Sequence, residues 1–177
     1  MFKLNYVLWL GFVFCSCKQK NESSNATQHL NSTQIPTCAP EVTDKLWYSS
    51  GKKAPLFSGL SGIHYAVSTK NAEAQQYFDQ GLLLSFGFNH AEAARSFYEA
   101  ARLDSTCAMC RWGFAYVLGP NYNGGMESDN FTRAYEAVQK AKSLAVSSTP
   151  KEKDLIEALT HRYTNDTTLA RSVPDTA

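Results

Sequence analysis

Two adjoining segments carry small and apolar residues at helical spacing, and this pattern limits the possible folds more than any other feature of the chain. In the first segment these residues are Ala74, Tyr77, Phe78, Gly81, Leu82 and Ser85. After a break from Phe86 to His90 the spacing resumes with His90, Ala93, Ala94, Phe97, Ala100 and Ala101. Residues three or four positions apart share one face of an α-helix. Residues 71–105 are therefore predicted to form two amphipathic helices joined by a short turn.

Small residues at fixed places indicate how these two helices pack. Gly81 and Ala93 fall where two antiparallel helices would approach closely. The segment resembles a tetratricopeptide repeat, a helix-turn-helix unit of about 34 residues. The residues that match the family's small and aromatic positions are Gly81, Ala93, Phe97 and Ala100. Ser105 replaces the usual closing proline and Gln80 the usual leucine. The resemblance implies an all-α chain folded as an α-solenoid of antiparallel helix pairs.

The pattern recurs further along the chain. Residues 106–148 are predicted to form a second unit, whose first helix contains Met109, Trp112, Gly113 and Tyr116. A third unit is expected in residues 149–177, where Thr149, Pro150 and Glu152 fit a capping box with proline at the first helical position. No clear partner helix follows, so we expect the chain to be the N-terminal part of a longer protein. The whole pattern resembles exported bacterial tetratricopeptide lipoproteins of unassigned activity.

The N-terminus has the pattern of an export signal. Lys3 precedes an apolar run from Leu4 to Phe14, which is too short to span a membrane but suits a signal-peptide core. A small residue, Cys17 and then a polar stretch follow, so residues 1–17 resemble a bacterial lipoprotein signal with Cys17 as the lipidated residue. Cys15 is the weaker candidate because Phe14 is bulky, and an ordinary signal peptide is the alternative. The resemblance implies export and a lipid anchor in a bacterial membrane, on the periplasmic or outer-membrane face.

Two segments of different composition separate this signal from the helices. Residues 18–40 are rich in Asn, Ser, Thr and Gln and cannot bury enough apolar surface to fold, so we predict a flexible tether. Residues 41–70 contain Pro, Gly and Ser at intervals too short for a long helix and are predicted to be a loop-rich lead-in. Its aromatic residues, expected to pack onto the helices, are Trp47, Tyr48, Phe57 and Tyr65.

Composition and motifs narrow the classes of function. A formal net charge of +1 and 44% hydrophobic residues suit one modest globular domain with extensions and indicate no nucleic-acid partner. The sequence contains no glycine-rich phosphate loop, nucleophile elbow, paired-carboxylate motif or basic aromatic stripe. We therefore expect a protein that is not an enzyme and needs no cofactor.

Cys107 and Cys110 have the spacing of a redox pair at the start of a helix. A thioredoxin-like site needs a βαβ context, and a haem attachment site needs His where Arg111 stands. A structural zinc site would need two further ligands, and no second Cys-x-x-Cys exists. Two interpretations remain: a local disulfide in an oxidising compartment, or two small residues packed against the preceding repeat. A bridge from Cys38 to either one is a third option.

A second set of polar residues falls at the turns between the helices. His64, Asn89, His90, Asn121, Tyr122 and Asn123 are the candidate lining of a ligand pocket. Equivalent turns of stacked repeats lie on one edge, where these groups could converge and a neutral His90 could ligate a metal or accept a proton. Helix capping by Asn89, turn conformations at Asn121 and Asn123, and packing of His90 against Trp112 explain the same residues without a ligand.

The expected function is binding. Helix pairs of this kind would present a groove of first-helix side chains to a protein or peptide partner outside the cytoplasm. The alternative is a metal- or small-molecule-binding module, or a non-catalytic part of an exported enzyme. A peptide groove should depend on exposed first-helix residues such as Gln75 and Arg111, whereas a metal site should depend on the histidines.

Overall fold

The structure is a computed structural model that describes residues 45–60, 62–122 and 125–165. The described part is all-α. Its helices are α1 (Lys45–Ser49), α2 (Ala72–Phe86), α3 (His90–Leu103), α4 (Ala108–Leu118), α5 (Asn130–Leu144) and α6 (Pro150–Thr160), with a short 3-10 turn, η1 (Ala145–Ser147), after α5. The predicted signal of residues 1–17, Cys17 itself, Cys15, Cys38 and the tether of residues 18–40 lie outside the described residues.

Side-chain caps define where the helices begin. The Asn71 side chain accepts hydrogen bonds from the backbone N–H groups of Glu73 and Ala74 and caps α2. Asn89 caps α3 in the same way, as the capping interpretation of its turn predicted. At α6 the capping box of Thr149 and Glu152 is present, with proline at the first helical position, and this prediction is confirmed.

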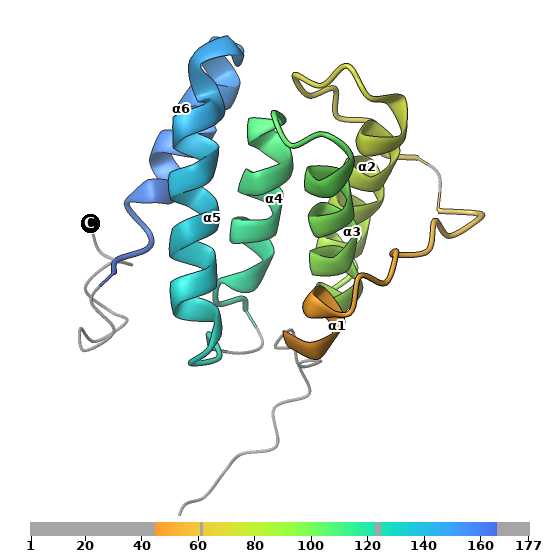
Figure 1. The fold of residues 1–177 in the computed structure, drawn as a ribbon, viewed down its shortest axis with the longest axis horizontal. Helices are drawn as coiled ribbons and strands as arrows, with labels where there is room; N and C mark the ends of the chain where they lie inside the picture. The colour runs from red at the N-terminus through yellow and green to blue at the C-terminus, as the bar shows by residue number, and fades with distance from the viewer. Residues whose placement is uncertain (1–44, 61, 123–124, 166–177) are drawn as a thin grey trace, which may run out of the picture. The chain divides into compact units, whose positions relative to one another are not determined.

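Each of the longer helices packs mainly against its neighbours in sequence, α2 against α3, α3 against α4, α4 against α5 and α5 against α6 (Figure 1). Helices α2, α4 and α6 also touch one another in that order. They therefore share one face of the helical array. The predicted helix pairs in residues 71–105 and 106–148 and the helix that begins at Pro150 are confirmed as helices.

Phe97 of α3 occupies the centre of the core and is fully buried. A Cβ atom added to Gly81 of α2 would lie 2.9 Å from its ring, and one added to Gly113 of α4 would lie closer still. Both glycines therefore provide the space into which the Phe97 ring fits between α2 and α4. This close approach explains physically why small residues recur at these two places.

The short helix α1 packs on α3 and α4 through aromatic contacts. The Tyr48 ring lies 4.9 Å from that of Tyr98 and 5.4 Å from that of Phe114, measured between ring centroids. Trp47 packs against the same core. Tyr65 also packs as predicted, whereas Phe57 is 41% exposed, so its predicted packing is wrong. Phe57 is held instead through its backbone N–H, which donates to Gln80.

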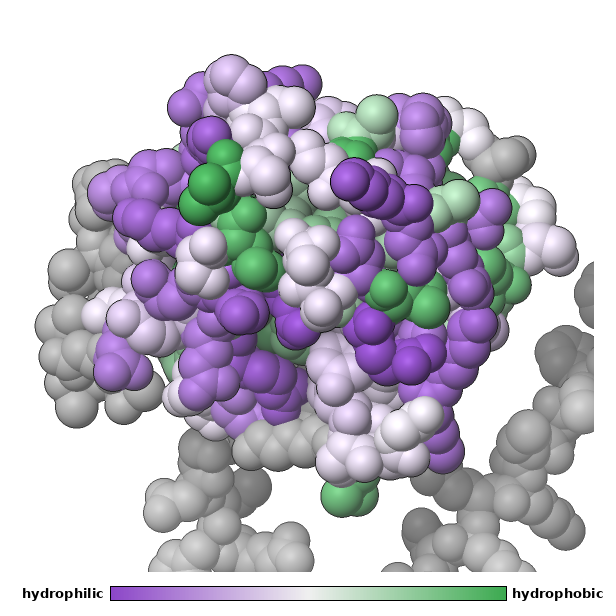
Figure 2. Space-filling model, turned by 45° about the horizontal axis from the view of Figure 1, so that its top comes forward, coloured by the Kyte–Doolittle hydropathy of each residue, from purple (hydrophilic) through white to green (hydrophobic). Residues whose placement is uncertain are grey.

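Figure 2 shows a surface on which small hydrophobic areas are separated by hydrophilic side chains. None of the helices in the described residues has the length and hydropathy needed to cross a membrane.

Candidate functional site

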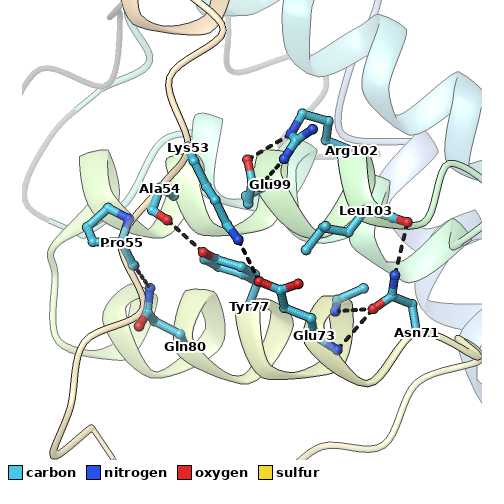
Figure 3. A network of polar contacts seen from close by, with 11 residues as sticks. Lys53, Ala54, Pro55, Asn71, Glu73, Tyr77, Gln80, Glu99, Arg102 and Leu103 are labelled. Carbon is cyan, nitrogen blue, oxygen red and sulfur yellow. Dashed lines mark hydrogen bonds and ion pairs between the residues drawn. The ribbon is translucent and has the colours of Figure 1, made fainter.

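After α1 the lead-in runs along α2 without regular secondary structure, and side chains of α2 bind its backbone. We call residues 54–60 and 62–68 the strap. The Tyr77 hydroxyl donates to the Ala54 carbonyl over 2.6 Å. The Gln80 amide donates to the Pro55 carbonyl over 2.8 Å (Figure 3). The same amide accepts from the Phe57 N–H, also over 2.8 Å. The first half of the strap is therefore bound as an extended peptide would be, by paired contacts to its backbone.

The second half of the strap is bound in the same manner. The Gln75 side chain accepts from the Val67 N–H over 3.0 Å and donates to the Tyr65 carbonyl over 2.9 Å. Asp79 accepts from the Tyr65 N–H over 3.0 Å. Gln75 is therefore half-buried and engaged with the strap, and the expectation that it is an exposed groove residue is wrong.

The end of the strap is hydrogen-bonded to a buried carboxylate of α6. Glu152 is 3% exposed and accepts hydrogen bonds from the N–H and the hydroxyl of Ser68, at 2.7 and 2.6 Å. The same carboxylate accepts from the Thr149 N–H over 2.7 Å. Burial alone would raise the pKa of Glu152, but the hydrogen bonds from Ser68 and Thr149 outweigh it and hold the pKa below its ordinary value.

An apolar groove of about 420 Å³ lies between the strap and the shared face of α2, α4 and α6. Its lining consists of Ile63, His64, Tyr65, Phe78, Leu82, Phe86, Met109, Trp112, Lys151 and Leu155. The Trp112 indole N–H donates to the Leu155 carbonyl over 3.0 Å, which fixes the ring across the floor. Arg111 is half-buried and does not line the groove. The groove thus offers an apolar floor with the basic side chain of Lys151 at its rim.

His64 belongs to this groove and not to the predicted polar pocket. Its Nδ1 lies 2.8 Å from a carboxylate oxygen of Asp79. His64 lines the groove and His90 lines a different cavity, so the two histidines do not converge in one pocket as predicted. The reason is that the α2 carboxylate holds His64 on the strap.

Three of the predicted pocket residues do share a cavity. His90, Asn121 and Tyr122 line a pocket of about 320 Å³ at the end of α4, which we call the His90 pocket. The rest of its lining is Ser85, Phe86, Phe88, Tyr116, Val117, Gly119, Pro120 and Arg162. Asn89 is the cap of α3 and does not line this pocket, and Asn123 lies outside the described residues.

The imidazole of His90 is partly buried beside an aromatic ring. Burial lowers the pKa of its imidazole and so favours the neutral form of the ring. Phe88 lies edge-on to it, with ring centroids 6.0 Å apart, while Trp112 stacks on Tyr116 at 5.1 Å. The ring contact of His90 is thus with Phe88, whereas the predicted packing partner, Trp112, stacks on Tyr116.

Cys107 and Cys110 form a disulfide with their Cα atoms 5.4 Å apart. Cys107 is the cap of α4 and Cys110 lies in its first turn, and both side chains are fully buried. The disulfide therefore links the cap of α4 to its first turn. Because both sulfurs are buried, we do not consider the pair a redox site.

Within the described residues, no three His, Cys, Asp or Glu side chains are grouped so that they could hold a metal ion. Comparisons with protein-family models, with curated proteins and with solved structures found no match to this chain. The apolar groove and the His90 pocket are the candidate binding sites among the described residues.

Proposed function

We propose that the chain is a tetratricopeptide-like helical scaffold that binds a peptide segment of a partner protein in the groove between the strap, α2, α4 and α6. The observation that carries the proposal is the groove itself. It has an apolar floor on the helix face where such a scaffold would present its first helices, and side chains of α2 already bind one irregular segment, the strap, through its backbone.

The chemistry of the groove defines the peptide that it fits. Partly buried Leu82, Trp112 and Leu155 offer surface to large apolar side chains, whose burial is worth about 1.5–3 kcal/mol each. In the part of the chain that the structure describes, the groove lining carries Lys151 and no carboxylate. A segment with two bulky apolar residues and a neighbouring acidic residue therefore matches both its apolar floor and its charge.

Changing Leu82 to glutamate is expected to weaken binding of such a peptide at least about tenfold, because a carboxylate would be buried against the apolar floor. The peptide would be selected from a random display library on the full chain, and its affinity measured by titration calorimetry. Val146 is 85% exposed on η1, outside the groove, so Val146→Glu is the matched control and should leave the affinity unchanged. Equal affinities for wild type and Leu82→Glu would contradict the proposal.

Charge gives a second pair of variants. Lys151→Glu should reduce the affinity of peptides that carry an acidic residue, whereas Lys153→Glu on the same helix should have a smaller effect because Lys153 does not line the groove. Circular dichroism of each variant would establish that the helices remain folded.

The scaffold is proposed to act outside the cytoplasm on a lipid anchor at Cys17. The support is the sequence pattern of residues 1–17 and the polar composition of residues 18–40. Metabolic labelling with a fatty acid should label the wild-type chain and leave Cys17→Ala unlabelled. Equal labelling of the two chains would contradict the proposed lipid anchor at Cys17.

A further inference from the structure

The His90 pocket is separate in chemistry from the apolar groove. Polar side chains of three elements meet there: His90 at the start of α3, Asn121 after α4 and Arg162 after α6. Arg162 donates through Nη2 to the Pro120 carbonyl over 3.1 Å, which positions the guanidinium beside the loop that follows α4. The pocket is therefore assembled from segments that are far apart in the sequence.

The imidazole of His90 makes no hydrogen bond to the described residues around this pocket. Both ring nitrogens are buried, and neither has a hydrogen-bond partner among the described residues. A buried polar group that has lost its water and gained no partner destabilises the fold, so such groups are rare and call for an explanation. A ligand that supplies the missing hydrogen bond would explain this one.

The backbone and the aromatic side chains beside His90 give an independent indication. Phe88 has φ of 58°, the left-handed region that residues other than glycine seldom adopt. Strained residues of this kind cluster at ligand-binding sites. Phe86, Phe88 and Tyr122 are 60%, 49% and 95% exposed, so three aromatic side chains stand in solvent around one pocket. Exposed aromatic surface that is gathered at a cavity marks a binding site.

The charge of the pocket selects the ligand. Among the described residues, its lining contains the guanidinium of Arg162 and no aspartate, glutamate or cysteine. Such a lining disfavours a metal cation and favours a carboxylate, which a guanidinium binds with directional hydrogen bonds. A volume of about 320 Å³ is at the lower end of the range for ligand pockets. The space suits a molecule built around a single ring.

We propose that the His90 pocket binds a small aromatic carboxylate. Its carboxylate would pair with Arg162, its ring would pack among Phe88, Tyr116 and Tyr122, and a polar substituent would hydrogen-bond to His90. The pocket shares only Phe86 with the lining of the peptide groove, and the proposal does not rest on the proposed function.

Benzoate and its neutral counterpart benzamide are the first pair of probes, added to the full 177-residue chain while backbone amide shifts are recorded by NMR. Benzoate should shift the amides of residues 85–90 and 116–122 with a Kd of about 1 mM or below, and benzamide should bind about tenfold more weakly. The absence of shifts at about 10 mM benzoate, or equal binding of the two probes, would overturn the proposal.

Variants assign the two polar contacts. Arg162→Gln should reduce benzoate affinity about tenfold and Arg162→Lys should restore part of it, while Arg111→Gln, outside the pocket, should change nothing. Para-hydroxybenzoate should bind wild type more tightly than benzoate does, and His90→Phe should abolish that difference. Equal losses in Arg162→Gln and Arg111→Gln would overturn the proposal. Leu82→Glu should leave benzoate binding intact, which separates this test from that of the peptide groove.

Discussion

Replacement of Gly113 by alanine is expected to destabilise the fold by about 2–3 kcal/mol, a change opposite in sign to the usual one. In the interior of a helix, glycine is about 1 kcal/mol less favourable than alanine, so the substitution ordinarily stabilises. Here the added Cβ would enter the ring of Phe97, a fully buried side chain that already touches the position of Gly81 on the other side. The ring has nowhere to move, and the helices must separate.

Urea unfolding of wild type and variant would measure this difference. Gly87→Ala is the matched control, because an added Cβ there meets only ordinary van der Waals contacts at 3.5 Å. It should change the free energy of unfolding by less than about 1 kcal/mol. Phe97→Leu combined with Gly113→Ala should cost less than the sum of the two single changes, since the smaller side chain relieves the overlap. An additive double variant, or a stabilised Gly113→Ala, would show that Phe97 does not pack there.

Replacement of Glu152 by alanine is expected to cost about 3 kcal/mol of stability. The change removes half of the capping box of α6 and leaves the N–H groups of Ser68 and Thr149 without their acceptor. It also releases the contact between the strap and α6. Glu157 on the same helix is exposed and pairs with Lys142, so Glu157→Ala should have little effect on unfolding. Equal losses in the two variants would contradict the structural role of Glu152.

The same carboxylate predicts a dependence on pH. Its pKa in the folded protein lies below the ordinary value of 4.5, so its contribution to stability is complete above that pH and is lost as pH falls through the folded value. Wild type should therefore lose stability more steeply than Glu152→Gln below pH 4.5, as measured by thermal unfolding at a series of pH values. Parallel curves would show that Glu152 is not held as a carboxylate by Ser68 and Thr149.

The helices could be predicted from the sequence because their signals are local. Asn71, Asn89 and Thr149 are caps, and each is followed by apolar residues at helical spacing. Gly81 and Gly113 were recognisable for a related reason, since the pattern that contains them recurs after about 34 residues. In both cases a few neighbouring residues carry the information.

The sites could be predicted only in part, because they depend on contacts between distant residues. Gln75 has the spacing of an exposed first-helix residue, but the strap arrives from outside its helix and binds it. Arg162 and His90 line one pocket although they are 72 residues apart in the sequence. Periodicity places residues on a helix face and gives no information about which irregular segment will cover that face.

In the proposed complex a partner peptide lies on the floor of the groove between the strap, α2, α4 and α6. The most direct measurement is NMR of the full chain with a selected, isotope-labelled peptide, recording intermolecular contacts from the Trp112 indole and the Leu82 methyl groups. We expect contacts from both residues to apolar side chains of the peptide, and none from the exposed Val146. A bound peptide that contacts Val146, or any surface other than the groove, while leaving Leu82 and Trp112 without contacts would contradict it.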